Sequence, residues 1–252
     1  MGASSPVRNL ALVGPNGSGK TTLLESLLFV SGATTRKGRV ADRNTVGDAS
    51  AESRDRQMST ELSVASFRHG GFDFTVIDCP GSVEFAHEAR QALVGVDLAV
   101  VVVEPVAERM VAVAPLLQYL DQLSLPHLVF INKMDRSEAP FRDLLQALRD
   151  SSARPVVPHQ YAIGRGESLV GYIDLVTEQA YAFRPGAPAD RIPLPFNVIV
   201  SNVPGPPQEF FIAGRAVGIG REKGEVLKDE EGLQLARSLG QRMAFLLKKL
   251  YG

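Results

Sequence analysis

The chain has 252 residues, 44% of them hydrophobic and 22% charged, which predicts one large domain or a domain with a smaller appendage. Its formal net charge of −1 at pH 7 argues against bulk electrostatic attraction to nucleic acid, and we expect no direct DNA binding. The longest strongly apolar run, residues 98–103, is too short to span a membrane, and residues 1–8 lack the apolar core of a signal peptide. The single cysteine, Cys79, suits a reducing compartment, so we expect a cytoplasmic protein without a membrane segment.

Apolar runs and helical patterns alternate along the first 150 residues. We expect strands near residues 9–13, 62–67, 72–78, 97–103 and 127–132, and helices near residues 19–30, 83–95, 107–122 and 139–150. This alternation predicts an α/β fold with a doubly wound, mainly parallel sheet and helices on both faces. Residues 31–60 are polar and glycine-spaced, and a loop of that length inside a compact domain is usually functional or disordered.

A phosphate-binding pattern follows the first expected strand. Residues 14–21 read GPNGSGKT and fit G-x-x-x-x-G-K-[ST], in which glycines let consecutive backbone N–H groups point at a phosphate. Lys20 can reach the β- and γ-phosphates, and the Thr21 hydroxyl can bind Mg²⁺. The residues predicted to contact nucleotide here are Asn16, Gly17, Ser18, Gly19, Lys20, Thr21 and Thr22.

The loop alone looks more like that of an ABC-transporter ATPase, but a second motif indicates guanine. Residues 132–135 read NKMD, fit N-K-x-D and follow an apolar strand. One carboxylate, Asp135, can accept hydrogen bonds from both N1–H and N2–H₂ of guanine, whereas adenine presents an acceptor and a donor in the wrong places. We therefore predict that Asn132, Lys133 and Asp135 bind the guanine base.

A third motif, at residues 78–81, reads DCPG and fits D-x-x-G. Asp78 can hold Mg²⁺ through water, and the Gly81 N–H can sense the γ-phosphate. The ABC signature L-S-G-G-Q does not occur in the sequence. Three motifs in this order, each at the end of a strand, favour a GTPase over an ATPase.

The motifs and their flanks resemble the GTPase domain of translation elongation factor G. Residues 76–85 and 132–136 carry the resemblance, and residues 158–176 are similar to the small β-rich insert of that factor. The resemblance covers roughly residues 8–185, and the divergent phosphate loop suggests an elongation-factor-G-like paralogue. It implies GTP and GDP as ligands, Mg²⁺ as cofactor, GTP hydrolysis as the reaction and the ribosome as a partner.

Two departures from the family pattern concern catalysis. The family has R-G-[IM]-T in switch I, and here residues 56–60 read RQMST, so Ser59 falls on the Mg²⁺-binding position, with Thr60 as the neighbouring candidate. The family histidine that orients the attacking water is replaced by Ser82, which is too short for that role. His87 is an alternative positioner, although a surface or packing role is favoured for it.

The resemblance therefore implies catalytic positions at Lys20, Gly81 and Ser82, and Mg²⁺ ligands at Thr21, Ser59 and Asp78. Loss of the water-orienting side chain predicts slow hydrolysis with GTP binding retained. A nucleotide-dependent binding module with negligible turnover stays open as an alternative, and an ABC-type ATPase is less favoured.

The domain organisation follows from where the resemblance ends. We expect a GTP-binding domain over residues 1–195, with the insert at about 155–185, and an unmatched tail over residues 196–252. The tail shows a strand-like run at residues 196–200, followed by a candidate for the fifth guanine-binding loop. It ends in an amphipathic helix from Asp229 to Leu250, which we expect to pack on the core, with partner binding as the alternative. The oligomeric state is left open.

Overall fold

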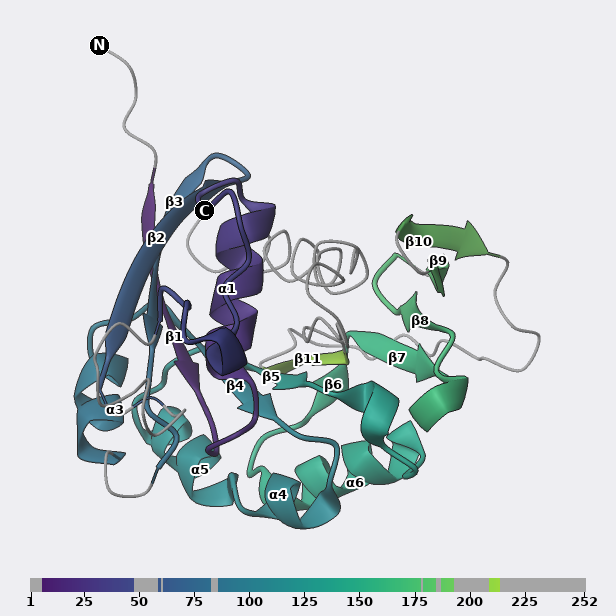
Figure 1. Cartoon of the computed structure of the whole chain (residues 1–252). Coiled ribbons are helices and arrows are strands. Elements are labelled where there is room, and N and C mark those ends of the chain that lie inside the picture. Colours follow the sequence, from purple (N-terminus) through teal and green to yellow (C-terminus); the bar gives the residue numbers. More distant parts are fainter. Residues whose placement is uncertain are drawn as a thin grey trace.

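A mainly parallel sheet forms the centre of the fold (Figure 1). The computed structural model describes residues 6–47, 59, 61–82, 86–177, 179–184, 187–192 and 209–213. The strands of this sheet are β1 (Val7–Val13), β2 (Ser63–His69), β3 (Phe72–Asp78), β4 (Leu98–Val103), β5 (His127–Ile131), β6 (Val157–Pro158) and β11 (Glu209–Ala213). Their order is β2-β3-β1-β4-β5-β11-β6, and every neighbouring pair is parallel except β2 with β3.

Strand β4 shows why the sheet is covered on both faces. All six of its residues are buried. Leu98, Val100 and Val102 belong to one apolar cluster, and the alternate residues of the strand belong to another. Because successive side chains of a strand point to opposite faces, an unbroken apolar run of this kind requires cover on both sides.

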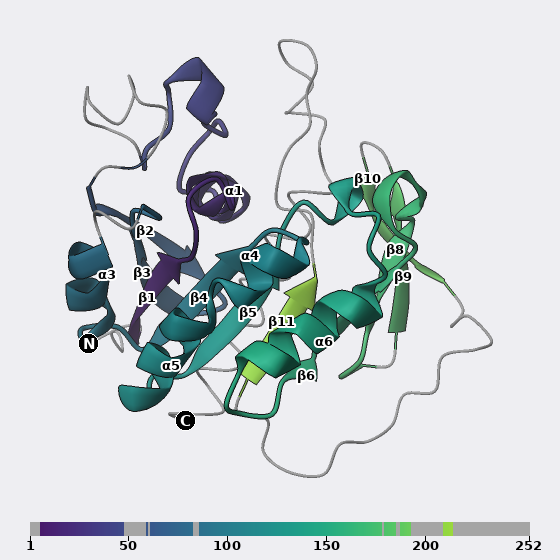
Figure 2. The same cartoon turned by 90° about the horizontal axis from the view of Figure 1, so that it is seen from below.

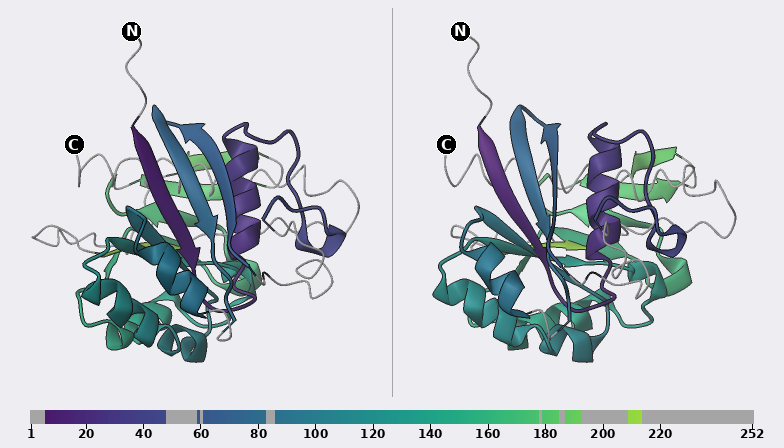
Figure 3. Two further views of the ribbon diagram at one scale, coloured as in Figure 1. Left: turned by 90° about the vertical axis from the view of Figure 1, so that its left-hand side faces the viewer. Right: turned by 60° about the vertical axis from the view of Figure 1, so that its left-hand side comes forward.

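Helices supply that cover. Helix α1 (Lys20–Val30) packs on one face, and the opposite face carries α3 (Ala86–Leu93), α4 (Ala107–Val111), α5 (Ala114–Gln122) and α6 (Phe141–Ser151). Figure 2 shows α1 and α4 to α6 on opposite sides of the strands, and Figure 3 shows the same separation from the side. No helix among the described residues has the length and apolar character needed to cross a membrane.

The helix predicted over residues 107–122 is divided into α4 and α5. Helix α4 ends at Val111, and α5 starts at Ala114 with Pro115 in its first turn. Proline has no N–H to donate to the preceding turn, but it fits the first turn of a new helix. The expectation of one continuous helix was therefore wrong, and Pro115 explains the break.

A second, antiparallel sheet follows α6 and confirms the β-rich insert. Its order is β10-β9-β8-β7, with bounds β7 (Gln160–Ile163), β8 (Gly171–Asp174), β9 (Gln179–Arg184) and β10 (Ala187–Ile192). The ring of Phe141 on α6 meets that of Tyr161 on β7 edge to face, with 4.8 Å between centroids. This contact attaches the insert to the core.

The predicted α/β class with a mainly parallel sheet and a small β-rich insert is confirmed. Strand β11 is an addition, because it lies beyond residue 195, in the segment that we assigned to the tail, and pairs with both β5 and β6. The strand predicted at residues 196–200 and the helix predicted from Asp229 to Leu250 lie outside the described residues.

Candidate nucleotide-binding site

The phosphate-binding pattern occupies the turn between β1 and α1. Gly14, Gly17 and Gly19 have φ angles of 134°, 77° and 96°, which residues with a side chain rarely adopt. These angles let the backbone curl around the N-terminus of α1, where N–H groups and the helix dipole favour an anion. The Lys20 Nζ donates to the carbonyls of Gly14 at 3.0 Å and Pro15 at 3.1 Å, so its ammonium group is held within the loop.

Three oxygen-bearing side chains converge beside this loop. The Thr21 hydroxyl donates to Asp78 Oδ2 at 2.6 Å, and Ser59 Oγ lies 3.2 Å from Thr21 Oγ1. They come from the start of α1, the end of β3 and the segment between α1 and β2. Hydroxyl and carboxylate oxygens are the ligands that Mg²⁺ prefers, so this donor set fits Mg²⁺. Among the described residues there is no cluster of three or more His, Cys, Asp or Glu side chains that suits a metal.

The backbone after β3 lies directly against the phosphate loop. A methyl group added at Gly81 would lie 2.6 Å from the Asn16 nitrogen, so only glycine fits at this approach. Ser82 follows and is partly exposed. His87 is exposed on α3, and its Nε2 lies 2.9 Å from Gln91 Nε2 of the same helix. This position agrees with a role on the surface.

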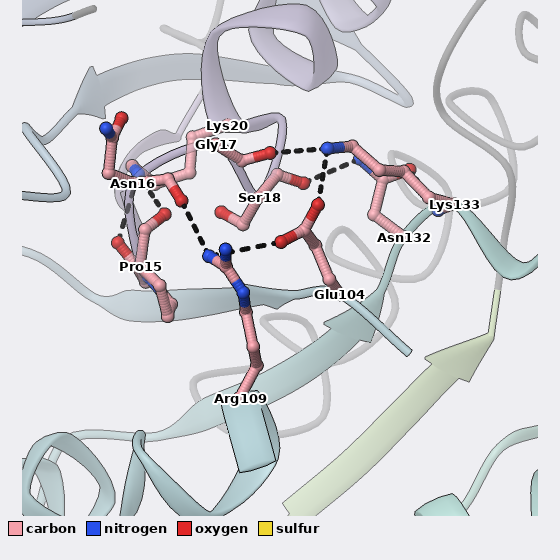
Figure 4. Close-up of polar contacts among 10 residues, drawn as sticks. Pro15, Asn16, Gly17, Ser18, Lys20, Glu104, Arg109, Asn132 and Lys133 are labelled. Carbon is pink, nitrogen blue, oxygen red and sulfur yellow. Dashed lines mark hydrogen bonds and ion pairs between the residues drawn. The ribbon is translucent and has the colours of Figure 1, made fainter. Parts of the chain in front are cut away.

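The predicted guanine loop is tied to the phosphate loop by its own side chains. The fully buried Asn132 donates from Nδ2 to the Ser18 carbonyl at 2.8 Å, and the Lys133 Nζ donates to the Gly17 carbonyl at 2.6 Å (Figure 4). Asp135 lies in a short 3₁₀-helix, Met134–Arg136, and remains partly exposed. The loops are therefore close enough for one ligand to contact both.

Sequence reasoning missed two charged residues at this site. Glu104 accepts from the Lys133 Nζ at 2.6 Å and pairs with the Arg109 guanidinium at 3.2 Å (Figure 4). The same guanidinium donates to the Asn16 carbonyl at 3.2 Å. Glu104 comes directly after β4, and the carboxyl end of a parallel strand is where ligand sites form, so its position was the available signal.

Cys79, inside the D-x-x-G motif, is fully buried. Burial first, and then the Asp78 carboxylate, raise the pKa of its thiol from 9.0 to about 12, against an opposing effect of Lys20. Since only the thiolate reacts, the reactive fraction near neutral pH is about a thousandfold lower than for an ordinary thiol.

We therefore expect iodoacetamide at about pH 8 to leave Cys79 unmodified in the folded protein and to modify it after unfolding. Intact-mass spectrometry measures this, and rapid modification of the folded chain would contradict the burial.

The contribution of this thiol to the free energy of unfolding is complete below the unfolded pKa near 9.0 and is lost as the pH rises toward about 12.

Together the strand-loop-helix turn, the parallel sheet and the converging side chains define a P-loop nucleotide-binding fold. The family described as elongation factor Tu GTP binding domain matches residues 5–220. The chain therefore belongs to this family.

The sequences of several named proteins are similar to this chain. The chain is 55% identical over 189 residues to an elongation factor G-like protein of Synechocystis, covering 75% of this chain and 28% of that protein. It is 34% identical over 190 residues to an elongation factor G-like protein of Mycobacterium tuberculosis, covering 74% and 26%. It is 32% identical over 174 residues to the mitochondrial ribosome-releasing factor 2 of Drosophila melanogaster, covering 69% and 24%. The chain thus spans about a quarter of the length of these curated relatives.

A solved structure is similar as well. A crystal structure of a protein from Thermus thermophilus superposes with a TM-score of 0.69 and 32% identity, covering 77% of this chain and 29% of that one.

Proposed function

We propose that this chain binds GTP and GDP together with Mg²⁺ and hydrolyses GTP slowly. The observation that carries the proposal is the pair of hydrogen bonds from Asn132 and Lys133 to the carbonyls of Ser18 and Gly17. They join a loop with the guanine-reading pattern to a loop with the phosphate-binding pattern. A nucleotide held by both loops would be selected at its base and at its phosphates together.

The side chains near the phosphate loop would divide the work of phosphate binding. The loop N–H groups and the Lys20 ammonium would stabilise phosphate charge, and the Gly81 N–H would contact the γ-phosphate. Thr21, Ser59 and Asp78 would hold Mg²⁺, which when bound neutralises charge on the β- and γ-phosphate oxygens. Asp135 would accept hydrogen bonds from the guanine edge.

Slow hydrolysis follows from the residue after D-x-x-G. Phosphoryl transfer depends mainly on positioning the attacking water and stabilising charge, and Ser82 lacks a ring that reaches a water at that place. Binding does not depend on this side chain. A nucleotide-dependent binding module with negligible turnover is the second candidate, and the same Ser82 favours it.

Asp135→Asn should shift base preference from guanine to xanthine, because xanthine carries an accepting oxygen where guanine carries the amino group. We expect GDP affinity to fall by about a hundredfold or more and xanthosine diphosphate affinity to rise, since a mismatched base edge leaves polar groups unpaired. Isothermal titration calorimetry with both diphosphates, with GTP and with ATP measures the change. Asp143→Asn on the exposed start of α6 is the matched control. Equal affinity of the unchanged chain for GTP and ATP would refute the guanine assignment.

We further propose that the partner is the ribosome. The support is the naming of relatives as elongation factor G-like and as ribosome-releasing factor. Cosedimentation with ribosomes in the presence of GDP or of a non-hydrolysable GTP analogue tests this. Binding that depends on the nucleotide state with no stimulated turnover would favour the binding module, and absence of binding in either state would contradict the proposed partner.

A further inference from the structure

A carboxylate inside α1 is bonded to a distant segment of backbone. Glu25 is 1% exposed and faces the segment of residues 38–47, which follows α1. Its Oε2 accepts from the Gly38 N–H at 2.9 Å, and its Oε1 accepts from the N–H groups of Val46 and, at 3.3 Å, Gly47. Burial of a carboxylate is costly without such donors, and charge-assisted bonds of this kind are strong. Glu25 therefore fixes both ends of the segment to α1.

The segment lies too close to α1 for side chains at its two glycines. A methyl group at Gly47 would lie 2.9 Å from Thr21 Cγ2 and 3.3 Å from Asp78 Oδ2. At Gly38 it would lie 2.8 Å from the Thr45 Cα and against the Glu25 carboxylate itself. Gly47 is also bonded at its carbonyl by the Ser63 hydroxyl of β2. The end of the segment thus lies against Thr21 and Asp78, two of the three side chains proposed to hold Mg²⁺.

Glu25 and Thr21 are four residues apart on one helix, so they lie on the same face one turn from each other. The helix that presents the Thr21 hydroxyl therefore also presents the carboxylate that holds Gly47 beside the Thr21 methyl group. Loss of the Glu25 bonds would remove this anchor, so that Gly47, still bonded to Ser63 at its carbonyl, could move away from Thr21 and Asp78 and admit water there.

We propose that Glu25 is a positioning residue that keeps residues 38–47 against the proposed Mg²⁺ ligands Thr21 and Asp78. In this position the segment slows release of Mg²⁺-bound nucleotide. This inference rests on the proposed GTP and GDP binding. Glu25 acts through Gly47, not through a contact of its own with phosphate. Its effect should therefore appear only when Mg²⁺ is present, whereas a purely structural role would affect release with and without the metal.

The test compares nucleotide release in Mg²⁺ and in EDTA for Glu25→Gln, which keeps the size of the side chain but removes one acceptor oxygen and the charge. The probe is N-methylanthraniloyl-GDP, displaced by excess GDP and followed by fluorescence. We expect release in Mg²⁺ to accelerate about tenfold or more, and release in EDTA to match the unchanged chain. Glu167→Gln, exposed on the insert, is the matched control and should alter neither rate.

Gly47→Ala tests the same closure with Glu25 intact, because the added methyl group would push the segment from Thr21 and Asp78. We expect it to accelerate release in Mg²⁺ alone, as Glu25→Gln does. Amide exchange of the unchanged chain gives a readout if a variant fails to fold: the segment should exchange more slowly with Mg²⁺ and GDP than with GDP and EDTA.

Equal acceleration in both media, unchanged release in Mg²⁺ or unchanged amide exchange would overturn the inference and leave the proposed function standing. Failure of the unchanged chain to bind the labelled GDP in either medium would overturn the proposed function, and the inference with it.

Discussion

Lys20→Ala is expected to remove measurable binding of GDP and GTP while the chain stays folded. The Lys20 Nζ is held by two carbonyls of its own loop, at 3.0 and 3.1 Å, so it is already in place beside the proposed phosphate site. A preorganised ammonium group makes strong charge-assisted contacts with phosphate, and we expect its loss to weaken binding by about a thousandfold.

Calorimetric titration with GDP and Mg²⁺ measures the loss, and a thermal melt followed by circular dichroism checks the fold. Arg68→Ala removes a cation from β2, on an exposed side chain paired with Asp73, and is the control that should bind normally. Normal GDP affinity of Lys20→Ala would show that the loop does not bind phosphate as proposed. Loss of the cooperative melt would instead assign Lys20 a role in the fold.

Ser82→His is expected to raise the rate of GTP hydrolysis. The side chain follows Gly81, whose backbone lies against the Asn16 nitrogen, so an imidazole there would stand beside the phosphate loop. A positioned orienting or general-base group contributes about 10²–10⁴-fold to such a step. The effect depends on the rest of the site, in particular on whether Ser59 completes the metal ligands beside Thr21.

Single-turnover hydrolysis of GTP, with and without ribosomes, measures the rate for both chains. Ser82→Ala is the matched control and should hydrolyse GTP as slowly as the unchanged chain. Fast ribosome-stimulated turnover by the unchanged chain would overturn slow hydrolysis. A slow Ser82→His chain with unchanged GTP affinity would show that the substitution at residue 82 is not what limits the rate.

Much of the core was predictable because its signals are local. The strand β4 is an unbroken apolar run, and α1 begins directly after the phosphate-binding pattern. Three motifs at the ends of β1, β3 and β5 also meet at one edge, as parallel strands require. The position of the three motifs at that edge was enough to predict that Thr21, Asp78 and Asn132 lie on the same side of the sheet.

Other features depend on contacts between residues far apart in the chain. Strand β11 is a short segment beyond residue 195 that pairs with β5 and β6. No local sequence pattern predicts these two neighbours. Glu25 reads in the sequence as one of several polar residues in α1, and its three backbone partners lie 13 to 22 residues away. Glu104 likewise acquires its role from Lys133 and Arg109 in space.

Residue order alone therefore specified the class of fold, the phosphate loop and the guanine motif, because each is a short pattern tied to the end of a strand. Tertiary structure alone decided that Ser59 lies beside Thr21, that Glu104 links Lys133 to Arg109 on α4, and that Glu25 bonds the backbone at both ends of residues 38–47. These relations depend on hydrogen bonds and ion pairs that form only when the packed sheet brings separate segments within about 3 Å of each other.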